Sequence, residues 1–479
     1  MRSLHCSSLV AVALVAACGP AQTSEDGRTL GDVLVEAPDA QWRYEVRVDP
    51  ALARLEVDAL LEEAATTTLG VDAPAEAFIE DVNVWDGRGW RSVTLQQGTF
   101  DVPECRRGCR LRYGFALAEA AAQVRDEEVA GWGQGAVLSP PSAWLLRPPD
   151  DGIPFAFAVR PARGVDFVSG VWPHARAEGV YSGDSVYLWR SPYSAFGRFE
   201  RERLAVGGGV IEVAIVAGEQ PLDRAATLRW IEGSAATVAE YFGRFPVPRV
   251  LVLVLPRPGQ RIHGKEIGGG GASIILHVGA EASEPHFARD WVNVHEMIHL
   301  GVPAMPREHL WLTEGLATYV EPLARARRGE LDVEKVWRDM MEGMVHGLPE
   351  EGDRGLDRTP TWGRTYWGGA LFALVADLEI RKRTGSERSL DDALRAVVRA
   401  GGHNGVFWSI RRFLEVGDRA TQTTVLTEQY DAWAGRPVMV ELAALWRDLG
   451  VALEDGAVRF DDEAPLAEHR RALTAPSSL

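Results

Sequence analysis

The chain has 479 residues, with 51 Lys and Arg against 68 Asp and Glu, and a formal net charge of -17 at pH 7. This acidic balance argues against nucleic acid as a partner, because phosphate backbones are bound by basic surfaces. The length suffices for two or three domains, and the hydrophobic share of 46% is that of a globular protein with a substantial core.

Residues 1–17 have the pattern of an export signal. Arg2 opens the segment, and the apolar run from Leu9 to Ala17 is too short to remain as a membrane span. The run ends in VAAC, which resembles a bacterial lipobox, so Cys18 is expected to carry a lipid. Residues 18–34 then form a polar tether. We expect an exported protein anchored to a membrane, in the outer membrane or at the periplasmic face if the host is Gram-negative.

Residues 35–217 are predicted to form an N-terminal, antiparallel, sandwich-like β domain. Apolar and charged residues alternate with a period of two, as in WRYEVRV from Trp42 to Val48. Cys105 and Cys109 are the cysteines that remain after the signal and Cys18. In an exported protein the sequence CRRGC is expected to close a small disulfide loop. The alternative, half of a zinc site, lacks partner residues nearby.

The pattern changes in the segment 218–325, which we assign to a second domain. A helix is predicted over 222–242 and a buried strand over 250–255. Four glycines then lead into a strand over 272–278. The run lacks the Lys-Ser/Thr of a phosphate-binding loop, so we expect an edge strand that a substrate backbone can approach. The expected substrate-binding residues are Gly269, Gly270, Gly271 and Ala272. A plain flexible loop is the alternative.

The sequence HEMIH contains the pattern H-E-x-x-H. His295 and His299 lie one helical turn apart on one face, so both imidazoles can reach one metal ion. Glu296 lies between them and is placed to take a proton from a water bound to the metal. A chance origin of the motif is the alternative, but the pattern is rare in a chain with eleven histidines. The residues therefore indicate a catalytic zinc site.

A catalytic zinc ion takes three protein ligands and keeps one position open. The third ligand is predicted to be Glu314, at the start of a second helix for which Thr313 would be the N-cap. Pro303 and Pro306 would let this helix fold back beside the first. We expect one Zn2+ per chain.

Residues 326–479 are predicted to form a C-terminal helical domain. Helices are expected over 332–344 and 366–384, and Ser389-Leu-Asp-Asp392 reads as a capping box that opens the next helix. Helices are expected to continue to about Leu449, and the residues after it read as a polar, frayed end.

Four motifs in this order resemble the glycyl aminopeptidase family of zinc peptidases: HEMIH, WLTEGLATYV, TYWGGALFALVADLEIR and SLDD. That family belongs with aminopeptidase N in the gluzincin group. The resemblance implies an α+β multidomain chain, with a thermolysin-like catalytic domain between the β domain and the helical domain. It also implies zinc on His295, His299 and Glu314, Glu296 as general base, and Tyr366 as the hydroxyl that steadies the oxyanion.

Two departures from aminopeptidase N concern the cleft. The connection between His299 and Glu314 is short. In the place of the family's Gly-x-Met-Glu-Asn, whose glutamate grips the free amine of the substrate, this chain has Gly-Gly-Gly-Ala-Ser. Glu266 is the nearest acid, but its spacing differs, so the sequence leaves amino- and endopeptidase action open.

The leading hypothesis is a zinc-dependent metallopeptidase, lipid-anchored outside the cytoplasm, that acts on peptide or protein substrates. A catalytically weak peptide-binding lipoprotein with the same fold is the alternative, although such a module needs neither base nor ligands. Metal-dependent hydrolysis of a non-peptide substrate is a third.

Overall fold

The structure is a computed structural model that describes residues 37, 39–62, 66–124, 126–133, 135–149, 152–217 and 222–476. The predicted signal segment 1–17, the lipidation site Cys18 and the tether 18–34 lie outside these residues. Across the part of the chain that is described, no helix combines the length and the apolar character needed to cross a bilayer.

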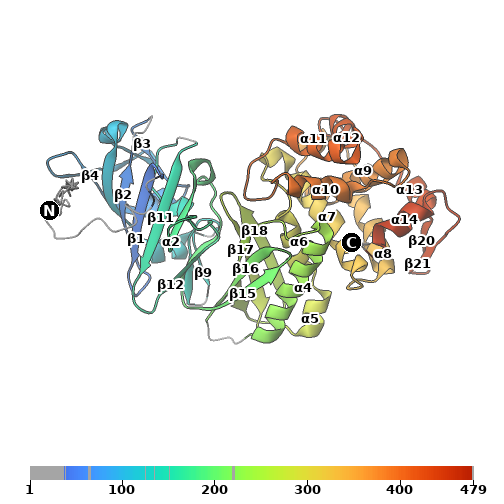
Figure 1. Ribbon diagram of the computed structural model, residues 1–479, viewed down its shortest axis with the longest axis horizontal. Helices are drawn as coiled ribbons and strands as arrows, with labels where there is room; N and C mark the ends of the chain where they lie inside the picture. Colours follow the sequence, from blue (N-terminus) through green and yellow to red (C-terminus); the bar gives the residue numbers. More distant parts are fainter. Residues whose placement is uncertain are drawn as a thin grey trace, which may run out of the picture.

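The N-terminal part is built from β-sheets (Figure 1). Its largest sheet has seven strands, in the order β13 (Val180–Asp184), β11 (Pro154–Pro161), β1 (Trp42–Val48), β2 (Leu55–Leu61), β8 (Cys109–Phe115), β4 (Ile79–Trp85) and β5 (Trp90–Ser92). The pair β1–β11 is parallel, and the other pairs are antiparallel. The sheet is therefore mixed, where the sequence predicted an antiparallel one.

Smaller sheets complete this part of the molecule. One contains β12 (Asp166–Ser169), β14 (Ser194–Gly197), β10 (Ala136–Leu138) and β9 (Gly131–Gly133), and another contains β3 (Thr68–Leu69), β7 (Thr99–Asp101) and β6 (Leu95–Gln96). Trp144, Phe157 and Phe196 make edge-on ring contacts in the core shared by the two larger sheets. Cys105 and Cys109 are joined by a disulfide.

A five-stranded sheet forms the middle of the molecule. Its order is β15 (Phe199–Val206), β16 (Gly209–Val216), β17 (Arg249–Arg257), β19 (Ala272–Gly279) and β18 (Ile262–Gly268). The three central strands are parallel, and both edge strands are antiparallel to their neighbours. The sheet thus begins before the predicted domain boundary at 217. The hairpin β15–β16 has a sequence pattern that fits either domain. Only the pairing of β16 with the distant strand β17 shows that the hairpin belongs to the five-stranded sheet.

The glycine run lies between β18 and β19. The predicted strand over 272–278 is confirmed as β19, but its predicted position at the edge of the sheet is wrong. β19 is an inner strand, paired on both sides, and β18 is the edge. A Cβ on Gly271 would lie 2.2 Å from the carbonyl oxygen of Gly170, and one on Gly270 would lie 3.0 Å from the Tyr187 ring. The glycines let the N-terminal part pack closely on the five-stranded sheet, because a side chain at Gly270 or Gly271 would press against Tyr187 or the Gly170 backbone.

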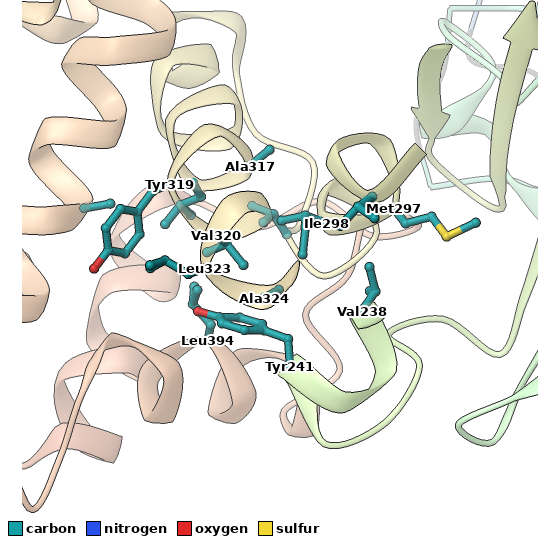
Figure 2. Packing of buried hydrophobic residues seen from close by; sticks show 14 of the residues in the cluster. Val238, Tyr241, Met297, Ile298, Ala317, Tyr319, Val320, Leu323, Ala324 and Leu394 are labelled. Carbon is teal, nitrogen blue, oxygen red and sulfur yellow. The ribbon is translucent and has the colours of Figure 1, made fainter. Parts of the chain in front are cut away.

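Four helices pack on this sheet or on one another. They are α4 (Arg224–Phe242), α5 (Glu284–Arg289), α6 (Val292–His299) and α7 (Leu310–Arg327). Two of them, α6 and α7, carry the predicted metal ligands. In Figure 2, Val238 of α4, Met297 and Ile298 of α6 and Val320 of α7 meet in one apolar core. Each such side chain contributes roughly 1.5–3 kcal/mol when it leaves water, so α6 and α7 are held together by burial.

The helices of the C-terminal part extend the same core. They are α8 (Val333–Gly343), α9 (Gly369–Thr384), α10 (Leu390–Arg399), α11 (Ile410–Thr421), α12 (Val425–Trp433), α13 (Leu442–Leu449) and α14 (Ala467–Thr474). Among them, α8, α9 and α14 contact α7. One hydrophobic cluster runs from Ile211 to Leu473. The predicted catalytic and helical domains therefore share a single core.

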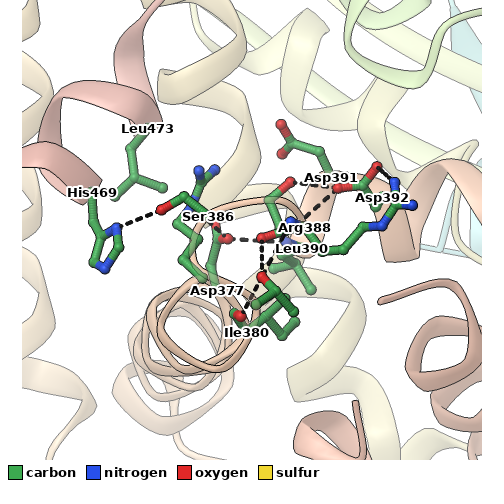
Figure 3. Close-up of polar contacts among 12 residues, drawn as sticks. Asp377, Ile380, Ser386, Arg388, Leu390, Asp391, Asp392, His469 and Leu473 are labelled. Carbon is green, nitrogen blue, oxygen red and sulfur yellow. Dashed lines mark hydrogen bonds and ion pairs between the residues drawn. The ribbon is translucent and has the colours of Figure 1, made fainter. Parts of the chain in front are cut away.

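The segment after Leu449 forms regular secondary structure, although its polar sequence suggested a frayed end. A hairpin of β20 (Val451–Glu454) and β21 (Ala457–Phe460) precedes α14, and Leu473 is fully buried. His469 of α14 lies 3.0 Å from the Ser386 hydroxyl (Figure 3). The predicted capping box of Ser389 and Asp392 is present at the start of α10. Up to residue 476 the prediction of a frayed end is wrong, because tertiary contacts fix a helix that its own sequence would leave marginal.

Candidate metal centre and substrate cleft

His295, His299 and Glu314 converge on one point. Glu314 Oε2 lies 3.3 Å from His295 Nε2 and 3.5 Å from His299 Nε2. One ligand atom from each residue lies within 4.8 Å of the others, and of the described His, Cys, Asp and Glu residues these three form the candidate metal-binding group. Two imidazoles and one carboxylate match the donor set of a catalytic zinc site, which leaves a position open.

Helix geometry and close packing bring the three ligands together. The two histidines lie one turn apart on α6, and Glu314 lies on α7. Helix α7 begins at Leu310, after a 3-10 turn, so the prediction of Thr313 as N-cap is wrong; its hydroxyl instead donates to the carbonyl oxygen of Leu310. The sequence did not show that α7 begins at Leu310, because Pro303, Pro306 and a 3-10 turn come directly before it.

The charges of the triad are strongly coupled. Burial opposes ionisation of Glu314, but His299 and His295 outweigh it and hold the pKa of this carboxyl well below its ordinary value. Burial likewise opposes the charged form of His299, but the carboxylates of Glu314, Glu296 and Glu266 raise its pKa to about 9. Burial lowers the pKa of His295, and Glu314 offsets this in part. A site this rich in negative charge favours a bound cation.

Glu296 lies beside the triad and is held by the edge strand. Its Oε2 accepts a hydrogen bond from the backbone N–H of Glu266 at 2.8 Å. Burial, with the added charges of Glu314 and Glu266, raises the pKa of the Glu296 carboxyl to about 7, against the opposing charge of His299. A carboxyl with a pKa near neutrality is suited to accept and return a proton.

Tyr366 reaches the same site from another helix. It lies in a π-helical turn, Arg364–Gly368, directly before α9, where the sequence predicted regular helix. Its ring lies 6.4 Å from that of His295, and it lines the same cleft as Glu314. Burial raises the pKa of the Tyr366 hydroxyl to about 12, so it stays protonated and can donate. Single π turns inside helices are frequent at functional sites.

The structure brings two residues into the cleft that the sequence did not assign. Glu266 lies on β18, and its side chain accepts a hydrogen bond from the Asn404 amide. The Asn404 Oδ1 atom is buried without a protein partner. Burial raises the pKa of Glu266, while His299, Asn404 and Arg190 lower it. The sequence predicts the substrate-binding strand at the glycine run, and the spacing of Glu266 from that run does not match the family motif. The edge strand is β18, which precedes the glycine run and contains Glu266.

A cleft of about 1,080 Å3 leads to the triad. It is lined by Arg190 of the N-terminal part, by β18, by α6 and α7, and by Asn404 and Phe407 of the loop between α10 and α11. Gly268 lines it, whereas the predicted substrate-binding residues Gly269, Gly270, Gly271 and Ala272 do not. They face the N-terminal part instead, because β18 and not β19 is the edge.

The fold was compared with known proteins. The chain is similar to an aminopeptidase N family protein from Idiomarina loihiensis, with a TM-score of 0.65, 13% identity, and coverage of 88% of this chain and 82% of that one. It is also similar to an M1 zinc metallopeptidase from Deinococcus radiodurans, with a TM-score of 0.53, 16% identity, and coverage of 84% and 95%. A mutant form of that protein bound to a Tyr-Ser-Ala substrate aligns with a TM-score of 0.52.

No family model and no curated protein sequence matches the chain. At these identities the likeness concerns the fold, which is the fold of M1 zinc metallopeptidases. The expected relation to aminopeptidase N therefore holds at the level of fold, and the closer resemblance to the glycyl aminopeptidase family stays a prediction.

Proposed function

We propose that the protein is a zinc-dependent peptidase that acts on peptides with a free amino terminus. The observation that carries the proposal is the convergence of His295, His299 and Glu314 beside the Glu296 carboxyl, which lines the same cleft. The chemistry of these groups fits zinc, and the M1 zinc metallopeptidase fold supports the choice of metal.

Zinc, when bound, acidifies a water ligand and polarises the carbonyl of the scissile peptide bond. Glu296 is placed to accept the proton of the attacking water and to return it to the leaving amine. The Tyr366 hydroxyl stays protonated and donates a hydrogen bond to the oxygen on which negative charge develops. The β18 edge offers backbone groups that align the substrate chain.

Recognition of a free amine rests on Glu266 and Asn404. The half-buried Glu266 carboxylate and the unpartnered, buried Asn404 Oδ1 are both hydrogen-bond acceptors, so they suit a group with several N–H donors and a positive charge. A primary ammonium group meets that description. Because Glu266 lies next to the general base, the amine would sit close to the bond that is cut, which makes the proposed activity that of an aminopeptidase.

The test is hydrolysis of matched peptides with free and acetylated amino termini. The zinc-loaded protein is expected to cut the free peptides and to lose this activity when a chelator removes the metal, with recovery on adding zinc. Glu266→Gln is expected to erase most of the preference for a free amine. Zinc bound at one ion per chain without turnover of any peptide would reject the proposal and favour a peptide-binding protein.

We also propose that the chain is exported and anchored by lipid on Cys18, as the sequence of its first 18 residues suggests. The proposal is tested by cell fractionation of the full chain and of Cys18→Ser. The wild type is expected in the membrane fraction and the variant outside it, and an equal distribution would contradict the anchor.

A further inference from the structure

Two tryptophan rings border the metal site on the side away from Glu266. Trp291 lies at the start of α6 and meets the His295 ring edge-on at 5.3 Å. Trp362 lies 6.3 Å from the Tyr366 ring, which in turn lies 6.4 Å from His295. The rings of these four residues thus form a continuous row, with the metal ligand and the oxyanion donor between the tryptophans.

Both indoles are unusually open to water. Trp291 is 53% exposed. Trp362 is 60% exposed, which is the highest exposed fraction among the large hydrophobic side chains of the described residues. Leu310, which lines the cleft at the start of α7, is 44% exposed. Trp291 and Leu310 line the cleft, and Trp362 adjoins it through its ring contact with Tyr366, which also lines it. Exposed large apolar side chains at such a cleft are typical of a binding surface.

The direction of a bound peptide follows from the order of residues along the cleft. β18 crosses α6 at Gly264, where a Cβ would lie 2.8 Å from Glu296 Cγ and 2.8 Å from Val292 Cγ1. Glu266 lies further along β18, beside Asn404 and within the influence of His299. The sequence of groups is therefore Glu266, then the triad and base, then Val292 and Trp291.

This order fixes which part of a substrate meets the tryptophans. If the amine lies at Glu266 and the scissile carbonyl lies at the triad, the residue that follows the cut bond must extend toward Trp291. Tyr366 lies against His295, the ligand that also contacts Trp291, so the row of rings joins Trp362 to the same end of the cleft. A side chain there would be met by aromatic surface from α6 and from the π-helical turn.

We propose that Trp291 and Trp362 form the subsite for the residue on the carboxyl side of the cut bond, and that this subsite selects a large apolar or aromatic side chain. The inference rests on the proposed peptidase function. It adds the second residue of the substrate as a specificity determinant, set by residues that neither bind the metal nor transfer protons.

The experiment compares two free-amine peptides that differ in the second residue, Leu-Phe-Gly and Leu-Gly-Gly. Wild type is expected to cut the first with the higher kcat/KM. In Trp291→Ala and in Trp362→Ala the ratio of the two kcat/KM values is expected to fall by about five- to tenfold, which is what the loss of one favourable aromatic contact produces. Trp362→Phe is expected to keep most of the ratio.

Two control variants separate a local effect from a general one. Trp189 is 55% exposed and lines the cleft at the Asn404 and Phe407 end, so Trp189→Ala is expected to leave the ratio for the second residue unchanged. Trp85, exposed on the N-terminal sheet, provides a remote control. A parallel readout is equilibrium binding of both peptides to Glu296→Gln, with and without each Trp→Ala change.

The outcomes distinguish the inference from the function on which it rests. Cleavage of neither peptide by the zinc-loaded wild type would reject the peptidase function itself. Equal cleavage of both peptides by wild type, or equal loss toward both peptides in the tryptophan variants, would overturn the subsite while leaving the peptidase function intact.

Discussion

The backbone N–H of Glu266 donates a hydrogen bond to Glu296 Oε2 at 2.8 Å. The bond joins Glu296, the proposed general base on α6, to the edge strand that is proposed to hold the substrate. Strand β18 would thus position both the base and the substrate. The bond fixes Oε2 against the sheet, and Oε1 is then the oxygen that can turn toward a reacting water. The residue that supplies this N–H also carries the carboxylate proposed to bind the substrate amine.

Glu296→Gln is expected to lower kcat by about 10²- to 10⁴-fold, because it removes the proton acceptor and keeps the shape of the side chain. The zinc content is expected to stay near one ion per chain, since both histidines and Glu314 are unchanged. Steady-state kinetics and metal analysis on the same sample check this. Loss of zinc together with activity would show that Glu296 is needed for the fold of the site instead.

Tyr366→Phe is expected to lower kcat by about 10²-fold or more with little change in KM, because the donor acts where charge develops in the transition state. The phenyl ring would still fill the space beside His295. Kinetics on one peptide across a range of concentrations separate the two constants. An increase in KM at constant kcat would instead place the hydroxyl in ground-state binding.

Gly315→Ala is expected to destabilise the protein by about 1–3 kcal/mol, as other overpacked cores are. A Cβ at Gly315 would lie 2.3 Å from Gly369 Cα, where α7 and α9 touch backbone to backbone. This contact sets Glu314 next to the turn that carries Tyr366, so zinc affinity is expected to fall as well. Urea unfolding and metal titration measure the two effects.

A matched control for this change lies in α4. Gly233 is also inside a helix, but a Cβ there would meet no atom within 4 Å. Gly233→Ala is therefore expected to stabilise the protein by up to about 1 kcal/mol through helix propensity. A similar loss of stability in both variants would contradict the role of the α7–α9 contact.

Glu212→Gln tests the link between the N-terminal part and the catalytic sheet. Glu212 pairs with Arg249 at 2.7 Å, and Arg249 also donates to the carbonyl oxygens of Ser169 and Val171. Burial opposes ionisation of Glu212, but the Arg249 guanidinium outweighs it and holds the pKa of the carboxyl below its ordinary value. The change is expected to cost about 1 kcal/mol of unfolding free energy at pH 7.

The sign of the pH dependence follows from the lowered pKa. The ionised Glu212 stabilises the folded state above the pKa of the unfolded chain, roughly 4.3, and this contribution is lost as the pH falls through the folded-state value. The difference between wild type and variant is thus expected to shrink below pH ~4. Glu200→Gln, which breaks an exposed pair with Arg224, is the control and is expected to change little.

Local pattern was enough to predict much of the metal site. The spacing of His295 and His299 on a helix, the acid between them, the helices over 222–242 and 332–344, and the capping box at Ser389 all depend on contacts within a few residues. Such features follow from helix geometry and capping, which depend on residues close together in the sequence.

Tertiary structure decided the features that depend on distant pairing. The sequence did not show that β18 is the edge strand, because the inner position of β19 depends on its parallel pairing with β17, from which β18 separates it in the chain. For the same reason it missed that Glu266 and Asn404, 138 residues apart, share one cleft. Residues of one helical turn could be assigned to the metal from the sequence alone, whereas the residues proposed to recognise substrate come from separate elements that only the packed fold brings together.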